Sequence, residues 1–448
     1  MHPTRVLTGI KPSGTPHLGN YVGAIRPAVV ASREPGIESY FFLADYHALI
    51  SVVEPARLQD ATLQIAASWL AAGLEPEPGK VWFYRQSDLP ETTELTWLLS
   101  CVAGKGLLNR AHAYKAANDR NRESGADEDA GVSAGLYMYP VLMAADILLF
   151  NAHRVPVGRD QIQHIEMARD FGQRFNHLYG EHFTLPDAQI EEHVATLPGL
   201  DGRKMSKSYD NVIPLFAPRE QLRKLVFSMV TDSRAPGEPK DTAGSHVFEL
   251  YQAFATPAET EAMRKDFADG IAWSAAKEAL FERLDLELAP VRERYQALVA
   301  EPARIEALLQ EHASRLREER VAPLLRELRS AVGLRPLTAG GAMPGTARPV
   351  RAAAQPVFKQ YREDDGRFGF KLVEGDRTLL VAEGFASPKE AGQFIASLRG
   401  GRYDADDARL QRGEGVEAED IRTALATMAE ADARKAKARA GAAGGQDA

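Results

Sequence analysis

The chain has 448 residues, enough for two or three domains with hydrophobic cores of their own. Its hydrophobic fraction of 44% and charged fraction of 26% are ordinary for a soluble globular protein, and no segment has the pattern of a membrane span or a signal peptide. The single cysteine, Cys101, excludes an internal disulfide framework and a thiolate metal cluster, so we expect a cytoplasmic protein. A net charge of -8 argues against an indiscriminate nucleic-acid coat but allows a local basic surface.

The N-terminal segment predicts a strand at 5–9, a glycine-containing turn, and a helix at 21–30. Such a turn places backbone N–H groups and the positive end of a helix against an anion. Gly19 would let a flat base or ribose approach the backbone closely, and His17 and Asn20 would offer hydrogen-bond donors. A glycine-rich turn alone indicates nucleotide binding only weakly.

Strands and helices alternate through the first part of the chain. Further strands are predicted at 39–44, 81–84 and 154–157, and helices at 55–73, 91–101, 133–150 and 159–175. This alternation predicts an α/β fold in which helices cover both faces of a parallel sheet. Ligands of such sheets bind at the carboxyl ends of the strands, where polar turns follow here.

Two other regions are rich in charge. Residues 104–130 carry interspersed basic side chains, for which a solvated or partner-facing hairpin and an acceptor-end or interface role are equally good interpretations. From 218 to 334 the pattern is almost wholly helical, with long amphipathic stretches at 277–299 and 301–331.

The loop at 199–211 is rich in Gly, Ser and Asp and carries Lys204 and Lys207, three positions apart. Two ammonium groups on such a loop can converge on one cluster of phosphate oxygens. The alternative interpretation is a solvated basic loop.

After residue 334 the composition changes to a Pro/Gly/Ala-rich linker. Beyond it, three short strands are predicted at 357–361, 368–373 and 378–381, followed by a helix at 387–398 with a Ser cap and Pro in its first turn. The tail from about residue 402 is charged, and its last dozen residues are predicted to be disordered.

Four motifs together resemble a known family. His17-Leu-Gly-Asn20 and Lys204-Met-Ser-Lys-Ser208 resemble the two signatures of class I aminoacyl-tRNA synthetases. Between them, residues 133–149 and 155–166 look like the tryptophanyl-tRNA synthetases in particular. Because the motifs occur in the family's order and spacing, the resemblance covers about residues 4–334, and it suggests a bacterial type with an extra C-terminal module.

The resemblance implies a domain arrangement. It gives a Rossmann-like catalytic domain at 1–216 and an all-helical tRNA- and anticodon-recognition domain at 217–334. Outside the resemblance, the composition and pattern predict a linker at 335–356, a small ββ β-α module of the α+β class at 357–400, and a charged, partly disordered tail at 401–448. The module resembles a repeat of unknown role in bacterial proteins. It would contact tRNA, bind another partner, or be a simple appendage.

The implied reaction is the activation of L-tryptophan by ATP, followed by transfer of tryptophan to the 3′-terminal adenosine of tRNA(Trp). The carboxylate of the amino acid attacks the α-phosphorus, so catalysis reduces to alignment and charge stabilisation, without a protein nucleophile. Mg²⁺ would be carried by the nucleotide, with no protein metal site. The family also implies a homodimer, with no membrane or DNA partner.

By the same resemblance, His17, Asn20, Lys204 and Lys207 are the catalytic residues, and the two lysines would hold the β- and γ-phosphates. The remaining ATP-binding residues implied are Lys11, Pro12, Ser13, Gly19, Gly158, Arg159, Asp160, Val194, Met205, Ser206 and Ser208.

Asp146 is the expected specificity residue, because indole offers one N–H donor and a carboxylate only accepts. The alternative is a solvent-facing carboxylate, although an unpaired charge in this apolar segment would be costly. The other tryptophan-binding residues implied are Leu7, His47, Tyr139, Met143, Val155, Val157 and Gln161. Tyr139 and Gln161 would hold the α-amino group and His47 would reach the carboxylate, although the histidine could be structural and the apolar residues plain core.

Two positions depart from the family pattern. Leu7 stands where Phe is frequent, which loosens the expected contact with indole, and Lys11 stands where Gln is frequent, which adds a cation near the reacting groups.

Three other functions compete with this interpretation. A tyrosyl-tRNA synthetase shares the fold and chemistry, but the Met143 to Asp146 spacing and the strand at 155–158 favour tryptophan. An adenylyltransferase would not need the helical region at 218–334. A catalytically silent homologue would not need the signature residues to be intact.

Overall fold

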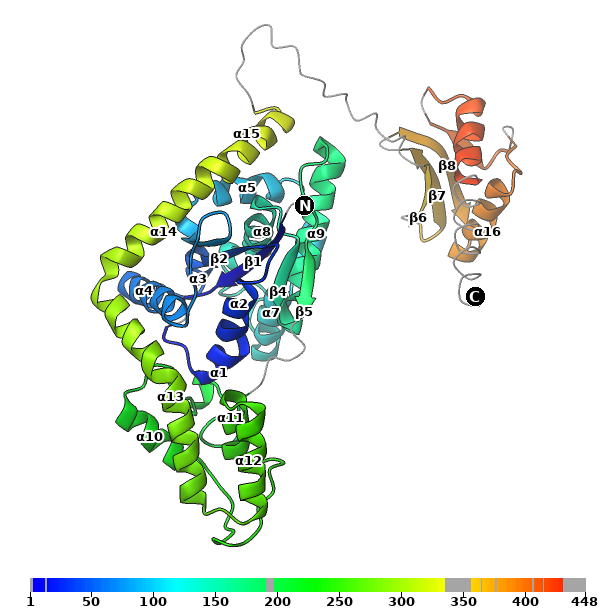
Figure 1. Ribbon diagram of the computed structural model, residues 1–448. Coiled ribbons are helices and arrows are strands. Elements are labelled where there is room, and N and C mark those ends of the chain that lie inside the picture. Colours follow the sequence, from blue (N-terminus) through cyan, green and yellow to red (C-terminus); the bar gives the residue numbers. More distant parts are fainter. Residues whose placement is uncertain are drawn as a thin grey trace, which may run out of the picture. The chain divides into compact units, whose positions relative to one another are not determined.

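The computed structural model describes residues 3–12, 14–190, 197–334, 356–363, 365–374, 377–404, 407–413 and 415–429, and only the backbone of residue 160. The chain divides into two compact units, residues 1–336 and 337–448 (Figure 1). No helix in these described ranges is both long and apolar enough to cross a membrane. The predicted disorder of the last dozen residues lies outside the described residues.

A five-stranded parallel sheet forms the centre of the first unit, in the order β3-β2-β1-β4-β5. Its strands are β1 (Thr4–Ile10), β2 (Ile37–Leu43), β3 (Val81–Arg85), β4 (Arg154–Val157) and β5 (Asp187–Ile190). β2 and β3 follow β1 on one side of it, and β4 and β5 later extend the sheet on the other side of β1. A crevice therefore opens at the carboxyl ends of β1 and β4, where such sheets bind ligands.

Both faces of this sheet are covered, which confirms the predicted fold class. Along β2, Phe41 and Leu43 belong to one hydrophobic core, and Tyr40 and Phe42 belong to the other. This alternation is the period of two that a strand imposes on its side chains. The first core includes residues of α4 and α13, and the second includes residues of α5, α8, α9 and α15.

The five helices predicted in the sheet layers agree with the structure to within a few residues. The helices of these layers are α1 (Leu18–Asn20), η1 (Tyr21–Ile25), α2 (Arg26–Ala31), α3 (Asp45–Ala48), α4 (Pro55–Ala71), η2 (Gln86–Asp88), α5 (Glu91–Ser100), α6 (Lys105–Leu108), α7 (His112–Ser124), α8 (Ala134–Leu149), η3 (Arg159–Gln161) and α9 (Ile162–Tyr179). Of these, α3, α6 and α7 are helices that were not predicted. The basic segment at 104–130 therefore contains the helix α7.

The helical region after residue 217 has two parts. Its elements are α10 (Arg219–Ser228), α11 (His246–Phe254), α12 (Pro257–Ala268), α13 (Trp273–Ala300), α14 (Pro302–Leu316), η5 (Arg317–Val321) and α15 (Ala322–Ala331). Figure 1 shows α10, α11 and α12 gathered at one end, while α14 runs beside the sheet layers. Leu316, Val321 and Leu328 are buried in the same core as the sheet residues Tyr40 and Trp82. The end of the region at 217–334 therefore shares a hydrophobic core with the sheet.

The second unit is an antiparallel sheet of order β6-β7-β8-β9 with α16 (Pro388–Arg399) packed on it. Its strands are β6 (Val357–Arg362), β7 (Phe368–Glu374), β8 (Arg377–Phe385) and β9 (Leu410–Arg412). The sequence analysis ended this module at residue 400, but β9 pairs with β8, and a helix from 418 to at least 429 buries Ile421 and Leu425 in the core of the unit. The folded module is therefore larger than predicted.

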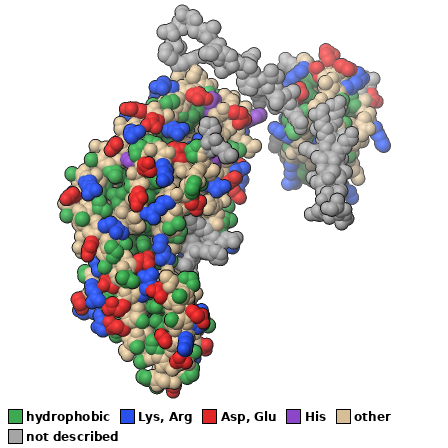
Figure 2. Space-filling view, viewed as in Figure 1, with side chains coloured by type: hydrophobic (Ala, Val, Ile, Leu, Met, Phe, Trp, Pro, Cys, Tyr) green, Lys and Arg blue, Asp and Glu red, His purple; other side chains and the backbone are tan. Residues whose placement is uncertain are grey.

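Charges of both signs are interspersed on the face of the first unit that Figure 2 shows.

Candidate active site

A cavity of about 410 Å³ lies at the crevice between β1 and β4. Lys11 and Gly14 line it from the turn after β1, Asn20 from α1, and Val157 and Gly158 from the end of β4. Four of these five residues were predicted to bind ATP or tryptophan. The structure thus brings together predicted site residues from both sides of the crevice.

Two segments nearly 200 residues apart in sequence join beside this cavity. The Leu18 N–H donates to the Ile213 carbonyl at 3.0 Å, and the Leu215 N–H donates to the Pro16 carbonyl at 3.0 Å. His17 and Pro214 face each other between these two bonds as an antiparallel bridge. The N-terminal turn and the end of the lysine-containing loop are therefore hydrogen-bonded neighbours.

Asn211 organises the lysine-containing loop, and it was not among the predicted site residues. It is 2% exposed, its Oδ1 accepts from the Ser206 N–H at 2.8 Å, and its Nδ2 donates to Asp201 at 2.7 Å and to the Lys204 carbonyl at 3.2 Å. A Cβ at Gly199 would lie 2.4 Å from the Asn211 side chain, so this position requires glycine. The sequence signal was an asparagine closing a Gly/Ser/Asp loop.

Met205 holds the same loop to the protein interior. Its side chain is buried in the first core with Leu18 and Ile213. The side chains of Lys204 and Lys207, on either side, are exposed. The loop is therefore fixed at its middle while its cations face outward.

His17 has a defined tautomer in this arrangement. Its Nδ1 accepts from the Asn20 N–H at 3.3 Å, and Asn20 Oδ1 accepts from the His17 N–H at 3.1 Å, which together form a capping box at the start of α1. Because Nδ1 accepts, Nε2 carries the proton and is the donor available to a phosphate. A Cβ at Gly19 would lie 3.0 Å from the His17 ring, so the close approach at Gly19 accommodates this ring in addition to any ligand.

Lys207 lies near the N-terminal turn. Its Nζ would be 3.8 Å from a Cβ at Gly14, and it lines a cavity of about 590 Å³ together with His17. Burial lowers the pKa of Lys207, and burial together with the charge of Lys207 lowers the pKa of His17 to about 4. His17 is therefore a neutral donor at pH 7. Lys204 faces Pro198 across an isolated bridge and does not line this cavity.

Asp146 on α8 is only 3% exposed, so the solvent-facing alternative for this carboxylate is wrong. Its Oδ2 lies 2.9 Å from His47 Nε2, and Gln86 Nε2 donates to Oδ1 at 2.8 Å and to Oδ2 at 3.0 Å. Burial raises the pKa of Asp146, and these hydrogen bonds oppose that rise. A carboxylate can accept about four hydrogen bonds, so one lone pair is available to an indole N–H.

Gln86, buried at the end of β3, was missed by the sequence analysis. Its Nε2 contacts both oxygens of Asp146, and its Oε1 accepts from the Tyr46 N–H at 3.1 Å. A glutamine after a strand carries no signal by itself, because its partner is 60 residues away in sequence. His47, which was expected to reach a substrate carboxylate, instead contacts Asp146 in this structure.

The predicted apolar residues gather in one place. Leu7 and Val155 are buried members of the second core, and Met143 and Val157 pack against it. Tyr139 Oη lies 2.6 Å from His164 Nε2, and its ring meets the His47 ring edge-on with centroids 6.3 Å apart. Gln161 lies in η3 after β4.

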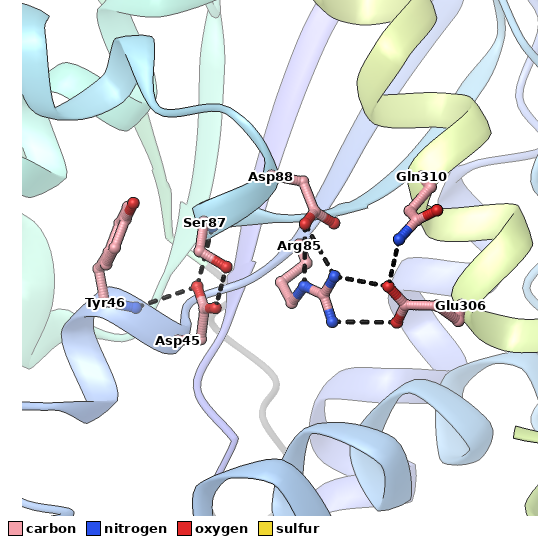
Figure 3. A network of polar contacts seen from close by, with 7 residues as sticks. All are labelled: Asp45, Tyr46, Arg85, Ser87, Asp88, Glu306 and Gln310. Atoms are coloured by element: carbon pink, nitrogen blue, oxygen red, sulfur yellow. Dashed lines mark hydrogen bonds and ion pairs between the residues drawn. The ribbon is translucent and has the colours of Figure 1, made fainter. Parts of the chain in front are cut away.

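The residues next to His47 and Gln86 in sequence belong to a network of polar contacts (Figure 3). Asp45 accepts from the N–H groups of Tyr46 and Ser87, each at 3.0 Å, and from the Ser87 hydroxyl. Arg85 donates to both Glu306 oxygens at 3.0 and 2.9 Å and to Asp88 at 2.8 Å, which lowers the pKa of Glu306. The network ties the turns after β2 and β3 to each other and to α14.

The other predicted ATP-binding residues differ in their exposure. Arg159 and Ser208 are exposed, Pro12 is buried, and Ser206 caps the turn Lys207–Tyr209 (η4) by accepting from the Ser208 N–H. Ser13, Val194 and the side chain of Asp160 lie outside the described residues.

Comparison with known proteins matches residues 1–289 to the family described as tRNA synthetases class I (W and Y). The chain is 71% identical over 395 residues to a tryptophan–tRNA ligase of Xanthomonas campestris, covering 88% of this chain and 91% of that protein. It is 59% identical over 405 residues to a tryptophan–tRNA ligase of Pseudomonas aeruginosa, covering 89% of each. Both matches are longer than the first unit of 336 residues, so they extend into the second.

A solved structure also matches. The tryptophanyl-tRNA synthetase of Campylobacter jejuni, in complex with ADP and tryptophan, is 38% identical with a TM-score of 0.67. The match covers 100% of that chain and 74% of this one, so about a quarter of this chain has no counterpart there.

The neutral state of His17 can be tested directly. In an NMR titration with ¹³C-labelled histidine, assigned against a His17→Asn variant, we expect His17 to titrate near pH 4. Because its pKa is about 6.5 when unfolded, the unfolded chain binds a proton between about pH 6.5 and 4 that the folded chain does not. This residue therefore removes stability as the pH falls through that interval. A titration near pH 6.5 would contradict the prediction.

Proposed function

The chain belongs to the family of class I tRNA synthetases for tryptophan and tyrosine and is a tryptophan–tRNA ligase, and we propose how its residues divide the work. The enzyme activates L-tryptophan with ATP, releases pyrophosphate, and transfers tryptophan to the 3′-terminal adenosine of tRNA(Trp). The proposals below concern the role of each residue and the state in which the enzyme acts.

ATP lies in the crevice between β1 and β4, with its phosphates at the N-terminal turn. The observation that carries this proposal is the hydrogen-bonded pairing of residues 16–18 with 213–215, which brings Lys207 and His17 to one cavity. The His17 Nε2–H and the start of α1 hold the phosphates from one side. The Lys207 ammonium approaches from the other and stabilises the charge that develops on the leaving pyrophosphate.

Lys204 joins Lys207 on the β- and γ-phosphates only when the loop closes over ATP, because Lys204 does not line the cavity that Lys207 shares with His17. Lys11 Nζ, which lies 3.2 Å from Ser51 Oγ, extends the cationic rim of the cavity. Mg²⁺ is carried by the nucleotide, since a hard cation of this size prefers phosphate oxygens and water.

Tryptophan lies on the α8 side of the sheet, with its indole N–H on the remaining lone pair of Asp146. Leu7, Met143 and Val155 form the apolar wall, and Tyr139 and Gln161 receive the α-amino group. His47 and Gln86 hold the Asp146 carboxylate in orientation. A phenylalanine side chain would bring no donor to Asp146 and would leave the buried carboxylate without this hydrogen bond, which supports strong rejection of phenylalanine.

The enzyme acts in the cytoplasm as a homodimer. Trp97 on α5 supports the dimer, because its side chain is 70% exposed and large exposed aromatic residues are typical of protein interfaces.

The proposed function is tested by amino-acid-dependent exchange of pyrophosphate into ATP. We expect exchange with tryptophan and none above background with tyrosine or phenylalanine. Exchange with tyrosine alone would identify the competing synthetase, and absence of exchange with every amino acid would indicate a silent homologue.

Lys207→Ala should lower the rate of tryptophan activation by about 100-fold or more, because it removes a charge that acts mainly on the transition state. Tryptophan affinity, measured by equilibrium binding, should change less than about twofold. Lys224→Ala, which removes an exposed lysine from α10, is the matched control. Equal losses of rate and affinity would mean that Lys207 acts structurally.

Gln86→Leu should raise the KM for tryptophan about tenfold, because a hydrogen bond to a charged group is worth about 1.5–3 kcal/mol. The KM for ATP should change little. Gln310→Ala is the control, since Gln310 donates to Glu306 at the far end of the same network. An unchanged tryptophan KM in the Gln86 variant would refute its role in orienting Asp146.

A further inference from the structure

The sheet of the second unit has one face that plays no part in the proposed aminoacylation reaction. On one side of β6, β7 and β8, Gln360 Nε2 donates to the Pro388 carbonyl and Phe370 meets Phe394, so α16 packs there. Arg377 pairs with Asp420 at 2.8 Å and places the C-terminal helix on that same side. The opposite side, which we call the open face, carries Lys359, Tyr361, Lys371, Val381 and Glu383.

Two lysines lie directly opposite each other on the open face. Lys359 of β6 and Lys371 of β7 are register partners, and both side chains are exposed. Such partners have Cβ atoms about 5 Å apart, and like charges in this position are destabilising. Neither ammonium has an ion-pair partner within the described part of the chain. The pair is therefore suited to an anion that is supplied from outside.

Tyr361 lies flat on the sheet beside these lysines. Its register partner is Gly369, where a Cβ would be 2.7 Å from the tyrosine ring, so the ring occupies the space that a side chain would take. The Tyr361 hydroxyl donates to Glu383 at 2.7 Å, and Lys371 Nζ lies over the ring, 5.1 Å from its centroid. The ring is thus held in one orientation under the long side chain of Lys371, which leaves the ring face when its ammonium turns to an outside anion.

We propose that the open face binds RNA, and that its occupant is the tRNA which the enzyme aminoacylates. The ammonium groups of Lys359 and Lys371 contact a backbone phosphate, and an unpaired base stacks on the Tyr361 ring. An aromatic platform beside cations is how single-stranded nucleic acid is bound without strong sequence preference. The chain as a whole carries a net charge of -8, whereas this face places two cations side by side. Such a local positive charge suits a polyanion.

An acidic protein segment is a poorer match to the same face. It would satisfy the two lysines but would leave the flat tyrosine ring without a planar partner. RNA satisfies both features, and the first unit already handles RNA as a substrate. The proposal rests on the proposed function only for the source of that RNA.

The test uses the full chain and transcribed tRNA(Trp). Lys359→Ala/Lys371→Ala should weaken tRNA binding about tenfold at about 0.1 M salt and reduce the slope of log affinity against log salt by about 1.4, since each phosphate contact on a single strand contributes about 0.7. Tyr361→Leu should weaken binding about fivefold, and Tyr361→Phe, which keeps the ring, should not.

Two controls make the result specific. Lys389→Ala/Arg402→Ala removes two exposed charges outside the open face and should leave tRNA affinity unchanged. Tryptophan-dependent pyrophosphate exchange, which needs no tRNA, should be unchanged in every variant. If the Lys359/Lys371 variant binds tRNA with wild-type affinity and salt slope, the proposal is overturned. If the wild-type enzyme shows no pyrophosphate exchange, the proposed function is refuted, and the tRNA-binding measurements still test the open face.

Discussion

Two backbone hydrogen bonds, from Leu18 to Ile213 and from Leu215 to Pro16, are the constraint on which the site depends. They join segments separated by nearly the whole catalytic region, so they close a loop that contains the intervening sheet and helices. Closing a loop of that length costs entropy that grows slowly with length, and the shared core around Leu18, Met205 and Ile213 offsets it. In the proposed phosphate site neither signature stretch suffices alone, because each would supply one side of that site.

A second constraint is the buried carboxylate of Asp146. A charge in an apolar layer is costly unless it is hydrogen-bonded, and His47 and Gln86 supply those bonds from the ends of β2 and β3. Both donors sit on short turns, so their positions depend on the Asp45–Ser87 and Arg85–Glu306 contacts behind them. The proposed recognition of the indole would therefore depend on α14, which the sequence had assigned to a separate helical domain.

The sequence predicted the elements that have strong periodicity and missed those that do not. Strands such as Ile37–Leu43 are buried on both faces and read as apolar runs, whereas Asp187–Ile190 and Leu410–Arg412 are short, polar edge strands that only tertiary pairing stabilises. The motif residues His17, Lys207 and Asp146 were identifiable because their resemblance is local in sequence. Gln86 and Asn211 were not, because each acts through a partner or a turn geometry that a single sequence does not display.

The electrostatics of the phosphate site follow from how closely its donors converge. A protonated His17 beside Lys207 would place two cations together in a partly buried cavity, so burial and then the charge of Lys207 lower the pKa of His17, whereas burial alone lowers the pKa of Lys207. A neutral imidazole removes the repulsion and still offers one N–H, because the helix cap holds the proton on Nε2. When a triphosphate binds, its negative charge favours the charged form of Lys207. It also lowers the electrostatic cost of bringing Lys204 close to Lys207. The proposed cationic site is therefore incomplete in the free enzyme. The negative charge of the ligand makes it favourable for Lys204 to approach Lys207.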